Sequence, residues 1–134
     1  MHKWMLIIAA LLGASAVMSG AFGAHALQGV LSDQARGWYD TAVIYHTNHA
    51  LALLACGLLG QHVGKGAGSS WLFAAGVCFT LGVLVFSGTL YAMAFTGITK
   101  LGMITPIGGL FLIVAWLCLA VSASRLNSGV SCKP

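Results

Sequence analysis

The placement of charged residues constrains the fold of this chain more than any other feature of its sequence. Only eight positions have a formal charge: Lys3, Asp33, Arg36, Asp40, Lys65, Lys100, Arg125 and Lys133. They separate four charge-free stretches, at 4–32, 41–64, 66–99 and 101–124. A helix needs about 20 apolar residues to cross the hydrocarbon core of a bilayer, so each stretch can hold one such helix and none can hold two.

Composition excludes the common soluble classes of protein. Charged residues make up 6% of the chain and hydrophobic residues 59%, whereas a soluble domain has about 25% charged residues. A soluble enzyme, a disordered tail and a secreted disulfide-rich miniprotein are therefore excluded. Strands are not expected, because the apolar stretches are continuous and do not alternate with polar residues. The sequence predicts an all-α integral membrane protein with a single transmembrane domain over residues 1–134.

The predicted helices lie near residues 4–23, 41–60, 71–95 and 103–123. Their connections are short, which predicts antiparallel neighbours and a four-helix up-down bundle. Four of the six basic residues then fall on the side of both termini: Lys3, Lys65, Arg125 and Lys133. Because basic residues are enriched in cytoplasmic loops, we predict that both termini are cytoplasmic. Trp38 and Tyr39 then mark the outer interface, and Thr105 caps the last helix with Pro106 in its first turn.

Small residues are expected to pack the first helix. Ala9, Gly13, Ala16, Gly20 and Gly23 recur at intervals of four and three, which places them on one face. Between helices in lipid, small residues allow close approach and so favour association. The partner of this stripe is either another helix of the bundle, which we favour, or a second protomer.

Polar residues within the apolar stretches form the candidate site. On the predicted topology they gather in the outer half of the membrane: His25, Arg36, Tyr45, His46, Asn48, His49, Ser87, Thr89, Tyr91 and Thr105. If the second helix enters the membrane at Thr41, then His49 lies about 12 Å deep and level with Ser87. By the same count, Tyr45 lies level with Tyr91.

Two interpretations of this cluster remain open. One is a network of interhelical hydrogen bonds, each contributing about 0.6 kcal/mol. The other is a polar site for a metal, a haem, a quinone-like head group or a proton path, since ionisable residues inside a membrane are often functional. His25, His46 and His49 could supply imidazoles, with Met93 or Met103 as soft ligands. No carboxylate lies in a predicted span to orient them, so we predict no cofactor, with haem or copper held by His25 and His49 as the alternative.

Signatures of catalysis and of nucleic-acid binding are absent from the sequence. The chain has no Glu, so the zinc-protease pattern H-E-x-x-H does not occur. Asp33 and Asp40 are expected to be solvated charges near Arg36. The basic residues are spread over both membrane faces and form no cluster for phosphates. We predict that the protein is not an enzyme and binds no nucleic acid.

Several ordered blocks of sequence resemble a known family. They are residues 20–27 (GAFGAHAL), 49–54 (HALALL), 86–91 (FSGTLY) and 101–110 (LGMITPIGGL), with Trp38, Thr41 and Tyr45 between the first two. Together they resemble the domain-of-unknown-function 423 family, from about residue 5 to 123. The resemblance implies a small multi-span protein of the bacterial plasma (inner) membrane without an established activity. The family commonly has Gln where His46 stands, which implies that His25 and His49 are the shared candidate ligands.

These observations lead to three functional hypotheses. The first is a non-enzymatic accessory subunit or assembly module that lies in the lipid bilayer and packs through its first helix, within a larger membrane complex or a homo-oligomer. The alternative is a ligand-, metal- or haem-binding protein centred on His25 and His49. A small transporter or proton path through the polar cluster is the weakest of the three, because no carboxylate lies in a predicted span.

Overall fold

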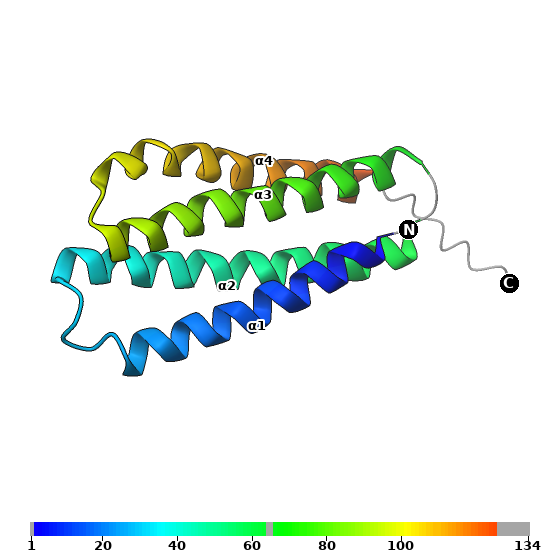
Figure 1. Cartoon of the computed structure of the whole chain (residues 1–134). Coiled ribbons are helices and arrows are strands. Elements are labelled where there is room, and N and C mark those ends of the chain that lie inside the picture. The colour runs from blue at the N-terminus through cyan, green and yellow to red at the C-terminus, as the bar shows by residue number, and fades with distance from the viewer. Residues whose placement is uncertain (1, 64–65, 126–134) are drawn as a thin grey trace, which may run out of the picture.

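Helices form nearly all of the described part of the chain, residues 2–63 and 66–125 of the computed structural model. In chain order they are α1 (Lys3–His25), α2 (Asp33–His62), α3 (Ala67–Thr96), the 3-10 helix η1 (Thr99–Met103) and α4 (Thr105–Ser124) (Figure 1). No strand occurs in these residues, and the predicted all-α fold is confirmed. All four α-helices are long and apolar enough to cross a membrane.

Consecutive helices are antiparallel neighbours, as in the predicted up-down bundle. Helix α2 packs on α1 and on α3, and α3 packs on α4 (Figure 1). Within the described residues, α1 and α4 make no extensive contact with each other. We name the end of the molecule where α1 begins the His2 end, and the opposite end, with η1 and the α1–α2 connection, the His25 end. Which of these two ends faces the cytoplasm is still a prediction from the basic residues.

A single apolar cluster joins all four helices. Its members include Met5 of α1, Leu53 of α2, Phe79 of α3 and Leu112 of α4, all buried. Met5 also covers Gly76 of α3, where a Cβ atom would lie only 2.5 Å from the methionine Cε. Toward the His25 end α1 diverges from α3 (Figure 1). One side of α1 is therefore left without a neighbouring helix in the molecule.

The start of α2 differs from the prediction by about two turns. The helix begins at Asp33 and not near residue 41, because Ser32 caps it by accepting a hydrogen bond from the Ala35 N–H at 3.2 Å. Arg36 and Asp40, one turn apart, then pair on its surface at 3.0 Å. Charged residues that were expected to lie before the helix thus form its first turns.

The start of α4 also corrects the prediction. Thr105 is not the N-cap, since Ile104 occupies that position and Thr105 is already helical. The Thr105 hydroxyl instead lies 2.8 Å from the Thr89 hydroxyl of α3. Pro106 stands in the first turn, as predicted.

Candidate functional site

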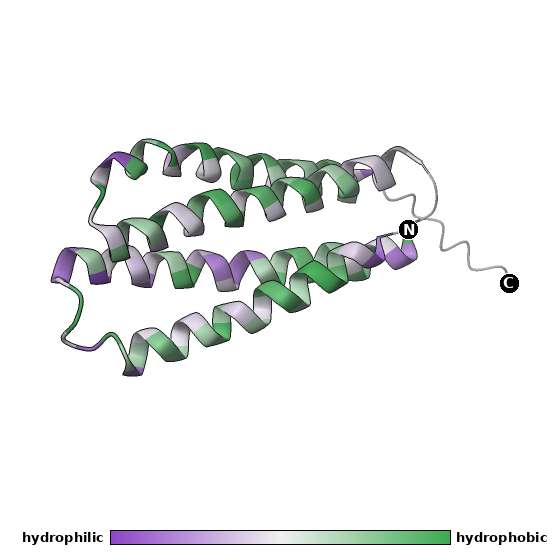
Figure 2. Ribbon diagram, viewed as in Figure 1, coloured by the Kyte–Doolittle hydropathy of each residue, from purple (hydrophilic) through white to green (hydrophobic). Residues whose placement is uncertain are grey.

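His46 joins three helices near the middle of the molecule. Figure 2 shows a hydrophilic segment halfway along α2. His46, in the middle of the range Asp33–His62, is 7% exposed. Its Nε2 lies 3.2 Å from the Ser15 hydroxyl of α1, and its Nδ1 lies 3.2 Å from the Tyr91 hydroxyl of α3. Because Ser15 donates its only proton to the Leu12 carbonyl, it must accept from His46 Nε2–H. A neutral His46 then accepts the Tyr91 proton at Nδ1, and both ring nitrogens are satisfied.

His49 is also fully hydrogen-bonded, but to different helices. Its Nδ1–H donates to the Tyr45 carbonyl of its own helix at 2.8 Å, and its Nε2 accepts from the Trp116 indole of α4 at 3.3 Å. The imidazole packs against Phe79, with ring centroids 5.8 Å apart. His49 therefore connects α2 with α4, whereas His46 connects α2 with α1 and α3.

The remaining polar residues of the predicted cluster divide into paired and lipid-facing groups. Ser87 donates to the Ala42 carbonyl at 3.0 Å and ties α3 to α2. Thr89 and Thr105 tie α3 to α4, as described above. Tyr45 and Asn48 are exposed on the surface of α2. The arrangement is thus a set of separate interhelical bridges and not one polar site.

The predicted register between α2 and α3, which set the side chains that lie at the same depth, is wrong by almost two helical turns. Tyr45 packs on Phe86, with centroids 4.4 Å apart, and is not level with Tyr91. Tyr91 instead packs on Tyr39, at 5.2 Å. The prediction counted depth from Thr41, whereas α2 begins eight residues earlier, so the register between α2 and α3 was displaced.

The structure does not bring the proposed histidine ligands together. His25 is exposed at the end of α1. Nearby Gly23 meets Tyr39, which precedes His49 by ten residues, so about 15 Å of helix separates the two levels. Of the two methionines considered as ligands, Met93 is buried in an apolar cluster and Met103 is 74% exposed. No group of three metal-ligating His, Cys, Asp or Glu residues occurs among the described residues.

The predicted small-residue stripe of α1 lies mainly against α2. Ala9, Ala16 and Gly23 are buried, and a Cβ on Gly20 would lie 3.7 Å from Val43. Gly13 differs, since no atom lies within 4 Å of the position of its Cβ. The stripe is therefore covered from within the molecule, except at Gly13.

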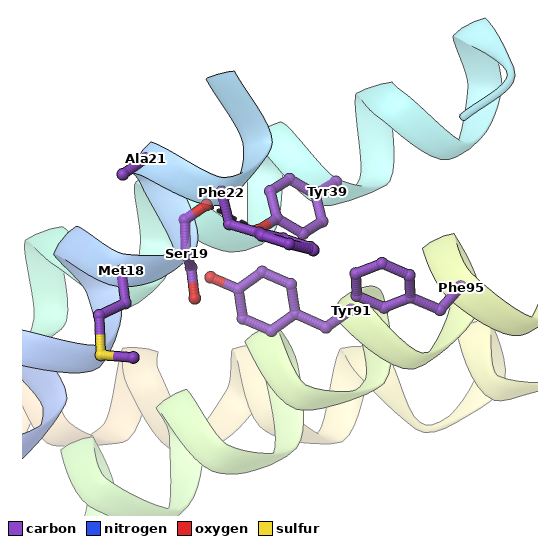
Figure 3. Close-up of a pocket in the computed structure, with 7 residues that line it drawn as sticks. All are labelled: Met18, Ser19, Ala21, Phe22, Tyr39, Tyr91 and Phe95. Carbon is purple, nitrogen blue, oxygen red and sulfur yellow. Dashed lines mark hydrogen bonds between the residues drawn. The ribbon is translucent and has the colours of Figure 1, made fainter. Parts of the chain in front are cut away.

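A groove opens between α1 and α3 toward the His25 end (Figure 3). It has a volume of about 630 Å³ and is lined mainly by Met18, Ser19, Phe22, Tyr39, Tyr91 and Phe95. A second hollow of about 180 Å³, which we call the deep part, shares Tyr91 with this groove and is also lined by Leu12, His46 and Val83. The sequence alone did not identify this groove, because it depends on how far α1 diverges from α3.

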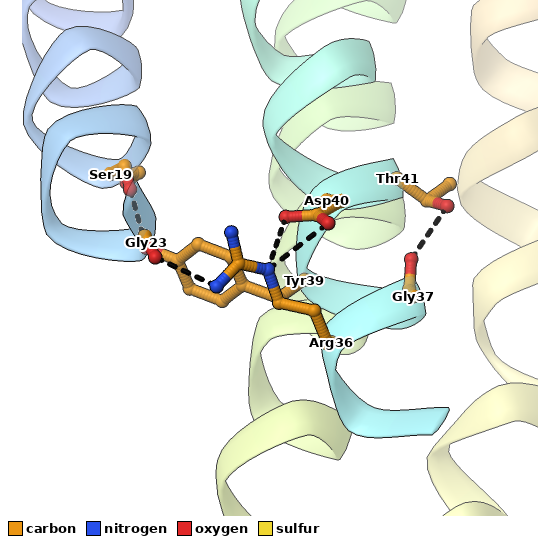
Figure 4. Close-up of polar contacts among 7 residues, drawn as sticks. All are labelled: Ser19, Gly23, Arg36, Gly37, Tyr39, Asp40 and Thr41. Carbon is orange, nitrogen blue, oxygen red and sulfur yellow. Dashed lines mark hydrogen bonds and ion pairs between the residues drawn. The ribbon is translucent and has the colours of Figure 1, made fainter. Parts of the chain in front are cut away.

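Tyr39 forms the floor of the groove and is only 2% exposed. Its hydroxyl donates to the Ser19 carbonyl at 2.6 Å, and its ring lies where a Cβ on Gly23 would stand. Arg36, paired with Asp40, also donates to the Gly23 carbonyl at 2.8 Å (Figure 4). Arg36 thereby satisfies a carbonyl in the last turn of α1, where a cation is favoured.

A second buried polar contact lies at the His2 end and was not anticipated. His2 Nε2 lies 3.0 Å from the Ser69 hydroxyl of α3, and the His2 ring fills the space above Gly60 of α2. Ser122 of α4 donates to the Gly68 carbonyl at 2.7 Å. No spacing in the sequence signals these pairs, since each joins residues more than fifty positions apart.

We expect the stability of the His2 end to depend on pH. Burial lowers the pKa of His2 below its ordinary value of 6.5. The unfolded chain therefore takes up the proton first, and the free energy of unfolding falls as the pH drops from about 6.5 to the lower folded-state pKa, by up to about 1.4 kcal/mol per pH unit. Melting curves in detergent between neutral and acidic pH measure this slope. His2→Gln is expected to reduce this slope, and His62→Gln, a control at an exposed residue, is expected to leave it unchanged. The assignment to His2 would be contradicted if the slope stayed the same in His2→Gln but fell in His62→Gln.

We also expect that neither metal nor haem stabilises the protein. Each ring nitrogen of His46 and His49 already has a partner, so a bond from either imidazole to a metal would have to replace one of these hydrogen bonds. Adding Zn²⁺, Cu²⁺ or haem to the purified protein should leave the melting temperature of the protein unchanged. The absorbance spectrum of the added metal ion or haem should also stay unchanged. A stoichiometric Soret shift that His49→Ala abolishes would refute this expectation.

Comparison with known proteins identifies the family. The model of the family described as "Protein of unknown function (DUF423)" matches residues 19–109. The UPF0382 membrane protein SH2409 of Staphylococcus haemolyticus is 43% identical over 123 residues, which cover 92% of this chain and 97% of that protein. The UPF0382 membrane protein YwdK of Bacillus subtilis is 39% identical, with 92% and 98% of the two chains covered.

A third relative gives the location. The UPF0382 inner membrane protein YgdD of Escherichia coli is 35% identical over 130 residues, 96% of each chain. No solved structure matches the chain. The four apolar helices and these relatives confirm the predicted location in the bacterial plasma membrane. The chain belongs to the DUF423 family, whose members among these relatives are named UPF0382 membrane proteins.

Proposed function

We propose that this protein is a non-enzymatic accessory or scaffold subunit that binds a transmembrane helix of a larger membrane complex. The observation that supports this most strongly is Asn48. Its side chain is exposed halfway along α2 and makes no hydrogen bond within the described residues. Hydrocarbon offers an amide no partner, so a lipid-facing Asn at this depth favours association with another helix.

The surface of α1 supports the same proposal. Four alanines share an exposed face of α1: Ala10, Ala14, Ala21 and Ala24. Small lipid-facing residues allow another helix to approach closely. Asn48 is two residues from His46, which meets Ser15, so it points to the side of α2 that faces away from α1, and the two exposed surfaces are separate.

The internal polar residues support a non-enzymatic role. His46, His49, Ser87 and Thr89 are each engaged in hydrogen bonds between or within helices. Among the described residues, the only ion pair is the exposed contact between Arg36 and Asp40. General acid–base catalysis requires a side chain that a substrate can reach and that is not already occupied by hydrogen bonds within the protein.

Site-specific photo-crosslinking in living cells tests the proposal. A benzophenone amino acid at Leu51, 61% exposed and one turn from Asn48, should form an adduct with one other membrane protein. At Leu117 of α4, 62% exposed, it should form none. Asn48→Leu should weaken the Leu51 adduct by at least about three-fold, the effect of one interhelical hydrogen bond. Thr47→Val should not, because the Thr47 hydroxyl already donates to the Val43 carbonyl.

Three outcomes would contradict the proposal. Equal adducts at Leu51 and Leu117 would indicate random collisions in the membrane. An adduct of twice the chain mass would indicate a homodimer in place of a larger complex. An adduct that is unaffected by Asn48→Leu would remove the amide from the binding surface.

A further inference from the structure

The groove between α1 and α3 is a wedge that is about one leaflet deep. At the His2 end the two helices are in contact, since Trp4 and Phe73 pack with ring centroids 5.7 Å apart. Together the groove and the deep part, which meet at Tyr91, line α1 from Leu12 to Phe22, about 15 Å of helix. This is half of the roughly 30 Å hydrocarbon core. The wedge therefore has the length of a lipid chain in one leaflet and is too short for a helix that crosses the bilayer.

The deep part of the groove offers no free hydrogen-bonding group, although three polar residues line it. Both nitrogens of His46 are paired, Ser15 donates to the Leu12 carbonyl, and Ser87 donates to the Ala42 carbonyl. Val83 and Leu84 form the rest of this lining. Next to them, Gly88 leaves open space, with no atom within 4 Å of the position of its Cβ. The deep part is therefore suited to bind a hydrocarbon chain.

Polar groups face the groove farther toward the His25 end. The Tyr91 hydroxyl gives its proton to His46, so it presents only lone pairs to the groove. In Figure 3 the Ser19 side-chain hydroxyl points toward the Tyr91 hydroxyl from the opposite wall. A hydroxyl group beside this pair can donate to Tyr91 and accept from Ser19. A carbonyl or an ether could only accept, and would leave the Tyr91 lone pairs unused.

We propose that this groove binds a membrane-soluble alcohol, an apolar chain with one terminal hydroxyl group. The hydroxyl lies beside the Ser19 and Tyr91 hydroxyls, and the chain extends past His46 toward Leu12 and Val83. The hydroxyl is then about 9 Å below the end of α1 at His25, nearer the membrane surface than the chain is. This site is separate from the exposed surface around Asn48 and does not depend on the proposed function.

Photolabelling in vesicles tests this site. The purified full chain is reconstituted into phosphatidylethanolamine–phosphatidylglycerol vesicles with a long-chain alcohol that has a diazirine near the end of its chain. We expect the label on peptides that contain Leu12 or Val83. The methyl ether of the same probe lacks the donor, and its labelling should be weaker by at least about three-fold, the effect of one hydrogen bond between partners in a membrane.

Variants distinguish specific binding from general contact with lipid. Tyr91→Phe should lower labelling by the alcohol to the level of the ether, and Ser19→Ala should also lower it. Tyr45→Phe removes a hydroxyl that is exposed elsewhere on α2 and should have no effect. Gly88→Leu fills the deep part and should reduce labelling by both probes.

The proposal fails if the alcohol and its ether label equally, or if the label is spread over the exposed face of α4. It also fails if Tyr91→Phe and Ser19→Ala, each with an unchanged melting temperature, label as the wild type does. If either variant loses stability, the comparison of alcohol with ether on the wild-type protein decides alone. Adducts at Leu51 in cells report on the proposed function independently, since neither variant alters that surface.

Discussion

Gly108→Ala is expected to destabilise the protein by about 1 to 3 kcal/mol, the usual cost of overpacking. Gly108 lies in α4 against α3, and a Cβ there would stand 2.4 Å from the backbone nitrogen of Phe86 and 2.7 Å from its Cα. Backbone atoms in a helix cannot move aside as the end of a side chain can. The two helices must therefore separate along the most extensive interface of the molecule.

Gly109→Ala is the matched control for this prediction. The neighbouring Cβ would lie 3.6 Å from the Phe86 ring, an ordinary van der Waals distance. We expect its effect to be below about 0.5 kcal/mol. Unfolding of both variants in mixed micelles, with increasing concentrations of a denaturing detergent, measures the difference in their free energies of unfolding. Equal losses of stability in the two variants would show that α3 and α4 are not in such close contact at Gly108.

Tyr39→Ala is expected to cost about 2 kcal/mol and to loosen α1 from α2. The ring is 2% exposed and packs on Tyr91, on Phe95 and over Gly23. An aromatic-to-alanine change in a water-soluble core costs about 3 to 5 kcal/mol. The expected loss is smaller here, because helices that separate in lipid do not expose the cavity to water. The same unfolding measurement applies.

Tyr39→Phe separates the ring from its hydroxyl. It removes only the hydrogen bond to the Ser19 carbonyl, so we expect a loss of about 0.6 kcal/mol. If Tyr39→Ala proves as mild as Tyr39→Phe, the ring is not buried between the helices.

The number of helices and their order could be predicted because the lipid limits the choices. Four charge-free stretches, each of one membrane thickness, leave only one arrangement of spans. The short connections then determine antiparallel neighbours. The α3 helix, for example, was predicted within a few residues of its bounds, Ala67 and Thr96.

The start of α2 was missed because charged residues were treated as limits of the helix. Ser32 followed by Asp33 is a typical N-terminal signal, and Arg36 and Asp40 have the spacing of a helical ion pair. These signals were present in the sequence. The first turns of α2 lie beyond the hydrocarbon, where charged residues can be solvated, so the cap and the ion pair are enough to extend the helix. The error in the register of His49 and Ser87 followed directly from it.

The partners of the polar residues could not be predicted from the sequence. Ser15, which hydrogen-bonds His46, was not recognised at all, and His25, considered as a ligand together with His49, is exposed at the end of α1. In a soluble helix the polar face shows which side is outside, but these helices are apolar on nearly every side. The rotation of each helix depends on close packing, such as Leu6 over Gly57, and such contacts cannot be read from one sequence.

The mass of the assembly that contains this chain tests the central claim most directly. The protein would be extracted from its own membranes in native lipid nanodiscs and weighed by native mass spectrometry, alongside Asn48→Leu and Thr47→Val. The proposal predicts a complex with at least one other membrane protein, retained in Thr47→Val and largely lost in Asn48→Leu. Recovery of the wild-type chain only as a monomer or a homodimer, in membranes from several growth conditions, would contradict it.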